Sequence, residues 1–235
     1  MAAYLIFPRN VGPPFEPVLF WGAGNAMTTR RLNPQDRMLE SMAGFIPRSG
    51  RVLVIPLVMG SFERDDSTFS IVDSSPDTTI RFRDVMVQRI KDVRRTVDFL
   101  ETRKDIRADR VGYYGLSWGG QNAPFVLAIE SRIKAAALNS AGYATGRARS
   151  EVEAVNYAPR VRTPTLMLNG RYDAVFPYET SQVPFFNLLG TPKRDKVMET
   201  SEHGHLLDVE TSTGATLRWF DRYLSGKGVQ DGLPR

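Results

Sequence analysis

The sequence predicts an α/β fold, with a mostly parallel sheet and helices on both of its faces. Short apolar runs of strand length recur along the 235-residue chain. Between several of them lie segments whose apolar residues repeat at three- and four-residue steps, which is typical of amphipathic helices. Since no internal repeat or linker divides the chain, we expect a single domain over residues 1–235.

Two apolar runs predict the first buried strands. The run at 18–21 reads VLFW and stops at a glycine, which favours a strand that feeds a tight loop. The run at 51–58 reads RVLVIPLV, and Pro56 predicts that this strand ends early or lies near an edge of the sheet. Between the two runs we expect a helix at 37–45.

The strongest helix is predicted at 80–103. Its apolar residues follow helical spacing, and arginine and aspartate fill the opposite face. Thr78 or Thr79 is expected to cap its start. The polar stretch 60–79 before it is predicted to be a surface loop.

The rest of the chain continues the alternation. Strands are predicted at 109–114, 133–138, 165–168 and 196–199, and helices at 123–131, 178–189 and 213–224. The connection between the second and third of these strands is short, so we expect a small cap or none over the sheet edge.

Composition argues against several classes of function. The chain has no cysteine and only two histidines, so we expect no metal site and no cofactor. Its net charge of +5 comes from basic residues scattered among acidic ones, so we expect no nucleic-acid partner. Its apolar runs are too short for a membrane span, which takes about 20 residues. With no signal-peptide pattern visible, a cytoplasmic location is favoured.

The motif GLSWG at 115–119 points to a nucleophile. It fits G-x-S-x-G, in which the serine sits on a sharp strand-to-helix turn with its hydroxyl exposed. An ordinary glycine-rich turn is the alternative. The predicted strand before the motif and the predicted helix after it favour Ser117 as a catalytic nucleophile.

A serine nucleophile needs a base, and the chain offers His203 and His205. Both follow the strand at 196–199, where this order of elements places the base. His203 precedes a glycine and can occupy a tight turn, whereas His205 precedes two leucines and is expected to pack at a helix start. We therefore predict His203 as the general base, with His205 as the alternative.

Asp173 is the predicted third member of the triad. It follows the strand at 165–168, so it should lie at the same sheet edge as Ser117. The order Ser, Asp, His is that of α/β-hydrolases. An Asx-turn or helix cap is the alternative for Asp173. Asp208 is the second choice of acid, but we expect it to cap the last helix.

Two backbone N–H groups are expected to stabilise an oxyanion. One belongs to Trp118, the residue after the nucleophile, and the other to the loop after the strand at 18–21. In that loop Ala23 is our choice and Gly24 the second. The Gly-Ala-Gly there lacks the third glycine and the acidic residue of a dinucleotide site.

Four segments carry a resemblance to a known family: FWGAGNA at 20–26, GSFER at 60–64, GLSWGG at 115–120 and TLMLNGRYD at 165–173. They resemble the dienelactone-hydrolase-like α/β-hydrolases and, more narrowly, the hydrolase domains found behind bacterial serine/threonine protein kinase domains. The resemblance covers almost the whole chain. It implies Ser117 as nucleophile, Asp173 as acid and His203, whose following glycine matches the family's His-Gly pair, as base.

The chain also departs from that family's pattern. Dienelactone hydrolases proper use cysteine where this chain has Ser117, so dienelactone is not carried over as substrate. Ser201 and Glu202 replace the two glycines that usually precede the base. Members carry a strand hairpin before the position of Leu5. The resemblance therefore implies that this hairpin is missing, either because another domain precedes the chain in a longer protein or because the sheet is shortened at one edge.

We expect a serine hydrolase that cleaves small carboxylic esters through a Ser-His-Asp triad and an acyl-enzyme. Aromatic residues that could line its acyl pocket are Phe62, Trp118, Tyr143 and Phe176. A peptidase of oligopeptidase type is one alternative, since it would use the same residues. A catalytically silent hydrolase fold that binds or senses a ligand is the other.

Overall fold

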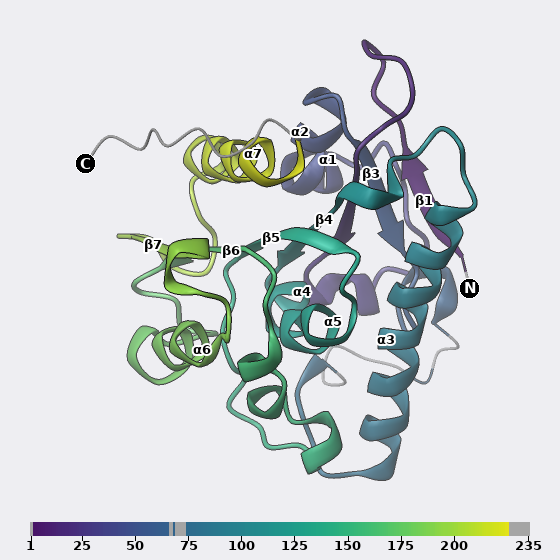
Figure 1. Ribbon diagram of the computed structural model, residues 1–235. Coiled ribbons are helices and arrows are strands. Elements are labelled where there is room, and N and C mark those ends of the chain that lie inside the picture. Colours follow the sequence, from purple (N-terminus) through teal and green to yellow (C-terminus); the bar gives the residue numbers. More distant parts are fainter. Residues whose placement is uncertain (1, 66–67, 69–73, 226–235) are drawn as a thin grey trace.

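The computed structural model describes residues 2–65, 68 and 74–225, and these form a layered α/β fold (Figure 1). Its central sheet has seven strands in the order β1-β3-β2-β4-β5-β6-β7, and only β1 runs antiparallel to its neighbour. The strands are β1 (Ala3–Ile6), β2 (Pro17–Trp21), β3 (Val52–Pro56), β4 (Val111–Leu116), β5 (Ile133–Asn139), β6 (Thr165–Gly170) and β7 (Lys196–Ser201). This confirms the predicted fold class.

Helices cover both faces of the sheet (Figure 1). They are α1 (Arg37–Ala43), α2 (Phe45–Arg48), α3 (Ile80–Glu101), α4 (Trp118–Gln121), α5 (Ala123–Ile129), α6 (Val183–Leu188) and α7 (Val209–Leu224). One apolar cluster lies between the sheet and α3, α5 and α6, and a second lies between the sheet and α1, α2 and α7. None of the described helices is both long enough and apolar enough to cross a membrane.

The central strands are buried on both faces, which is why they read as continuous apolar runs. In β4 every residue is buried, and successive side chains enter opposite layers. Tyr113 packs with the α3 and α5 layer, whereas Tyr114 packs with the α7 layer. In the strand order, β4 is also the central strand. Its carboxyl end therefore lies at the centre of the edge at which the parallel strands end.

Several element boundaries follow the predicted signals. The Thr79 hydroxyl accepts a hydrogen bond from the Phe82 N–H (3.1 Å) at the start of α3, and Asp208 accepts one from Thr211 (2.7 Å) at the start of α7. β3 ends at Pro56 and lies next to the edge strand β1, which agrees with the prediction that it ends early or lies near an edge. Part of the loop predicted at 60–79 lies outside the described residues.

The edge strand β1 was not predicted. Its four residues are only half-buried, so they show neither a continuous apolar run nor a clear alternation. Leu5 pairs with Val54 of β3. The missing hairpin implied by the family resemblance stays a prediction. Between β5 and β6, short 3-10 helices (Ser150–Val152, Ala154–Asn156 and Ala158–Arg160) pack against α3 and α5.

Candidate active site

Ser117 stands on a sharp turn between β4 and α4. Its φ of 53° and ψ of −103° are rare for a residue with a side chain and mark local backbone strain. Glycines make this turn possible. A Cβ at Gly119 would lie 1.8 Å from the Trp21 carbonyl oxygen, and one at Gly115 would lie 2.8 Å from the Gly119 oxygen. The Ser117 N–H donates to the Asn139 carbonyl (2.9 Å), which fixes the turn to β5.

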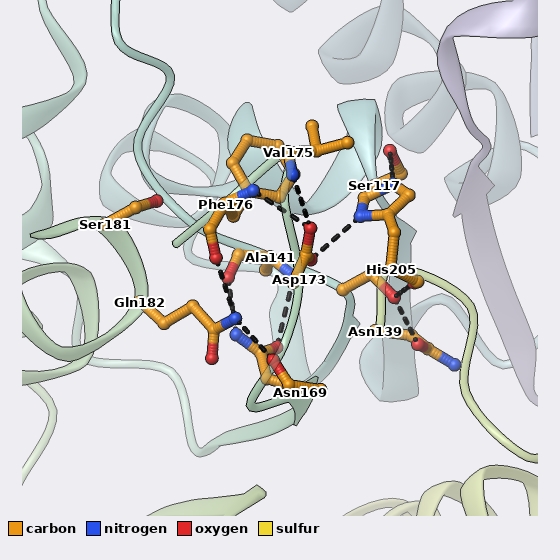
Figure 2. A network of polar contacts seen from close by, with 12 residues as sticks. Ser117, Asn139, Ala141, Asn169, Asp173, Val175, Phe176, Ser181, Gln182 and His205 are labelled. Atoms are coloured by element: carbon orange, nitrogen blue, oxygen red, sulfur yellow. Dashed lines mark hydrogen bonds and ion pairs between the residues drawn. The ribbon is translucent and has the colours of Figure 1, made fainter. Parts of the chain in front are cut away.

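Asp173 lies beyond the end of β6, where the structure buries it to 3% exposure. Its Oδ1 accepts hydrogen bonds from the N–H groups of Val175 (2.7 Å) and Phe176 (3.0 Å), as Figure 2 shows. This is the Asx-turn that the sequence offered as an alternative. Because one oxygen completes the turn, the other remains free for a side-chain partner.

That partner is His205, and it joins Asp173 to Ser117 (Figure 2). The Nδ1 atom of His205 lies 2.8 Å from Asp173 Oδ2, and its Nε2 atom lies 2.8 Å from Ser117 Oγ. An ionised carboxylate only accepts hydrogen bonds, so chemistry assigns the ring proton to Nδ1. Nε2 then carries the lone pair that faces the Ser117 hydroxyl.

The prediction that His203 lies against Ser117 was wrong. The histidine within hydrogen-bonding distance of Ser117 is His205. The His203 side chain is exposed, and its backbone carbonyl accepts a hydrogen bond from the Tyr172 N–H (2.9 Å). The loop after β7 also passes close to β6, since a Cβ at Gly170 would lie 2.0 Å from the Gly204 oxygen. This contact fixes the backbone at 203–204 and turns the next side chain, His205, inward.

Opposing effects act on the ionisation of Asp173. Burial alone would raise the pKa of its carboxyl group. The hydrogen bond from His205, the N–H groups of Phe176 and Val175 and attraction to the imidazole outweigh burial and hold the pKa below its ordinary value. Asp173 is therefore a carboxylate at neutral pH, suited to stabilise a positive imidazolium beside it.

Ser140, which sequence reasoning missed, anchors the backbone of His205. Its hydroxyl donates to the His205 carbonyl (2.5 Å), and its own φ of 52° lies in the left-handed region. Next to it, the Asn169 side chain accepts from the Ala141 N–H (3.1 Å) and donates to the Ala141 carbonyl (2.6 Å). Its position in the sequence could have indicated a role in the site, since Ser140 directly follows β5 at the same sheet edge as Ser117.

The predicted oxyanion donors, Trp118 and Ala23, lie on the turns beside Ser117. Trp118 is the first residue of α4, and the first N–H groups of a helix have no partner within it. Ala23 precedes the 3-10 helix η1 (Gly24–Met27). The two turns are tied together because the Gly119 N–H donates to the Gly22 carbonyl (3.1 Å).

Packing fixes the Trp118 side chain. Its ring meets that of Trp21 edge to face at 5.3 Å, and the buried Arg89 guanidinium lies 4.8 Å from its centre. Within the described residues, no group of three or more histidine, cysteine, aspartate or glutamate side chains could hold a metal ion.

No family model and no curated protein matches this chain in sequence. In fold it is similar to a cold-adapted esterase from an Arctic intertidal metagenomic library, with a TM-score of 0.68 and 21% identity over 94% of this chain and 88% of that one. It is also similar to Est1E from Butyrivibrio proteoclasticus, solved with ferulic acid, with a TM-score of 0.65 and 14% identity over 94% and 96%.

A third similar structure is a "putative dienelactone hydrolase" from Klebsiella pneumoniae subsp. pneumoniae MGH 78578. Its TM-score is 0.68, with 17% identity over 94% of this chain and 92% of that one. The chain therefore has the α/β-hydrolase fold, and its structural neighbours include esterases and a protein of the dienelactone-hydrolase type, as the resemblance implied. Nothing in these neighbours supports the link to kinase domains.

Proposed function

We propose that this protein is a serine hydrolase that cleaves carboxylic esters of small molecules. The observation that carries the proposal is the hydrogen-bonded chain from Ser117 through His205 to Asp173, with both contacts at 2.8 Å. A nucleophile, a base and a residue that orients the base are the three groups that acyl transfer from serine requires. The esterase folds among the structural neighbours support the same class of reaction.

In the proposed first step, Ser117 Oγ attacks the ester carbonyl while His205 Nε2 takes the hydroxyl proton. The carbonyl oxygen becomes an oxyanion, which the N–H groups of Trp118 and Ala23 stabilise. Asp173 stabilises the imidazolium formed at His205. The intermediate then collapses, the bond to the alcohol oxygen breaks, and His205 returns its proton to the leaving alcohol.

Water completes the cycle in the second step. His205 takes a proton from a water molecule, whose oxygen attacks the acyl-enzyme carbonyl and forms a second oxyanion. The bond to Ser117 Oγ then breaks, and the proton on His205 passes to that oxygen. The products are one carboxylic acid and one alcohol for each ester and water consumed.

The test combines a fluorophosphonate probe with hydrolysis of an aryl ester. We expect the probe to label Ser117 stoichiometrically, and Ser117→Ala to lower kcat by at least about 10⁴-fold. A Ser117→Ala variant that hydrolyses the ester as fast as the wild type would refute the proposal. A folded protein that neither reacts with the probe nor cleaves esters would instead be a silent hydrolase fold.

Matched substitutions of the two histidines test the base. We expect His205→Gln to lower kcat by at least about 10³-fold, because the Ser117 proton then has no acceptor. His203→Gln should stay within about threefold of the wild type, because its side chain points to solvent. The opposite pattern would identify His203 as the general base. Cleavage of peptidyl anilides in preference to aryl esters would indicate the peptidase alternative.

A further inference from the structure

The order of the strands gives the proposed active site two different sides. Ser117 follows β4 in the middle of the sheet. Asp173 and His205 follow β6 and β7 on one side of it, whereas the loops that carry Ala23 and Phe62 follow β2 and β3 on the other. A substrate bound at Ser117 therefore meets the proton-transfer groups on one side and the oxyanion loop on the other.

The chemistry of ester cleavage decides which part of the ester lies on which side. The alcohol oxygen has to receive a proton from His205 Nε2 when its bond to carbon breaks, so the alcohol must lie on the side of β6 and β7. The oxyanion faces the N–H groups of Trp118 and Ala23. The fourth substituent of the tetrahedral carbon is the acyl chain. It points away from His205, and a cavity beside the oxyanion loop can accept it.

A cavity of about 300 Å³ lies on that side. The oxyanion loop itself forms part of its wall through Gly22 and Ala23. The larger part of the remaining wall is apolar and includes Phe20, Leu39, Met42 and Phe62, and the polar residues Asn25, Thr29, Asn33 and Asp36 complete it. The apolar part of the wall favours a hydrocarbon group, since a polar group placed against it would lose its water without gaining partners.

The backbone of Phe62 shows that this wall is built at some energetic cost. Phe62 has a φ of 48°, and only two other described residues with side chains, Ser117 and Ser140, have positive φ. Both of those belong to the proposed active site. Strained backbone tends to persist where the surrounding structure needs a side chain in a particular place. Here the strain aims an aromatic ring at the space beside the oxyanion loop.

We propose that this cavity binds the acyl group of the ester, and that the preferred acyl group is a hydrocarbon group of about six to ten heavy atoms. The size follows from the volume, because a group of the size of water takes about 30 Å³. The proposal rests on the proposed ester hydrolysis. On the alcohol side, Val175 and Leu206 are 52% and 76% exposed, so they leave that side open to solvent. Selectivity for the acyl group should therefore exceed selectivity for the alcohol.

Leu39 offers the sharpest test, because it is a half-buried residue of the cavity wall outside the catalytic groups. Leu39→Trp narrows the cavity, and Leu39→Ala enlarges it. Leu217→Trp is the matched control, since Leu217 is equally a half-buried leucine but lines a separate hollow between α2 and α7. Two substrate series are measured: p-nitrophenyl esters with acyl chains of about two to twelve carbons, and acetates of alcohols of increasing length.

We expect Leu39→Trp to lower kcat/KM for the longer acyl chains by about tenfold or more, and to change that for the acetates by less than about threefold. Leu39→Ala should move the optimum to longer acyl chains. Leu217→Trp should leave both series unchanged. An effect of Leu39→Trp on the alcohol series alone, or equal effects of the two tryptophan variants, would overturn the assignment.

Failure of this proposal can be told apart from failure of the proposed function. If Ser117-dependent hydrolysis is present and the acyl profile does not respond to Leu39, the cavity assignment is wrong and the esterase proposal stands. If the wild type neither cleaves the esters nor reacts with alkyl fluorophosphonates of any chain length, the proposed function fails, and the acyl-pocket proposal fails with it.

Discussion

At the scale of single residues, Gly119 marks the closest approach between the nucleophile turn and β2. A Cβ at this position would lie 1.8 Å from the Trp21 oxygen and 2.6 Å from the Trp21 carbonyl carbon. A backbone contact of this kind cannot be relieved by rotating a side chain. Gly119→Ala must therefore displace the turn that carries both Ser117 and the Trp118 N–H.

We expect Gly119→Ala to lower kcat/KM for an aryl ester by at least about 10²-fold, because displacements of about 1 Å have effects of that size. Gly204→Ala is the control. It lies between the two histidines, but its Cβ would meet only the Tyr172 oxygen at 3.8 Å, an ordinary contact. Circular dichroism establishes that both variants fold. Equal activity of the two variants would show that the close contact between Gly119 and β2 does not affect catalysis.

The lowered pKa of the Asp173 carboxyl gives a second prediction at this scale. Because that pKa is lower in the folded state than the value of about 3.9 in unfolded chains, the ionised group stabilises the fold. This contribution is complete above about pH 4 and is lost as the pH falls through the folded-state pKa. The free energies of unfolding of the wild type and Asp173→Asn should therefore differ most at neutral pH and converge below about pH 4.

Urea titrations at a series of pH values measure that difference. A difference that stays constant or widens in acid would mean that Asp173 is not a stabilising carboxylate, and would weaken its proposed role beside His205.

Local pattern was enough to bring Ser117 and Asp173 to the same candidate site, but not to choose between the histidines. Ser117 lies in a motif whose glycines and flanking elements are close in sequence, and Asp173 directly follows a buried strand. The position of His205 depends instead on the hydrogen bond between His203 and Tyr172, which joins the loops after two strands. The glycine after His203 favoured His203 as the base. In the structure, this residue, Gly204, lies where the loop passes close to Gly170.

At the scale of elements, the start of α7 decides how much chain is left for the His205 loop. Asp208 caps the helix through Thr211, and hydrogen bonds from Thr211 lower the pKa of its carboxyl group. Asp208→Ala should therefore lower the urea midpoint, whereas Asp208→Asn should keep it, because asparagine caps helices equally well.

Ester hydrolysis by both Asp208 variants should stay within about twofold of the wild type, because the carboxylate beside His205 belongs to Asp173. A loss of activity in Asp208→Ala comparable to that of an Asp173 variant would restore Asp208 as a candidate acid.

Elements with a strong periodic or continuous apolar pattern were predicted, and those defined by tertiary contacts were not. The buried strands β2 to β6 and the amphipathic helices α3 and α7 follow from their own residues. The predicted helix at 37–45 corresponds to α1, which ends at Ala43, and α2 begins after Gly44 as a separate helix that was not predicted. β1 is short and half-buried, so its existence depends on the pairing with β3.

At the scale of the whole molecule, an ion pair between the half-buried Arg64 and the buried Asp92 ties the loop after β3 to the long helix α3. Asp92 is 2% exposed, and its Oδ2 atom lies 2.6 Å from Arg64 Nη1 and 3.0 Å from the Met59 nitrogen. Its Oδ1 accepts from the Gln88 amide (2.9 Å). The same loop continues into Phe62, so this ion pair fixes one wall of the proposed acyl cavity to the core of the molecule.

We expect Asp92→Ala to lower the free energy of unfolding by about 3 kcal/mol or more, because it leaves the Arg64 charge and the Met59 N–H without their partner. Asp84→Ala is the control on the same helix. Its carboxylate pairs with Arg83 at the surface, where such a pair contributes less than about 1 kcal/mol.

The loss in Asp92→Ala should appear as a lower urea midpoint with an unchanged slope, since the two apolar layers flank one continuous sheet and should unfold together. Equal losses in the two variants, or a second transition in Asp92→Ala alone, would show that the loop after β3 is not held to the core by this ion pair.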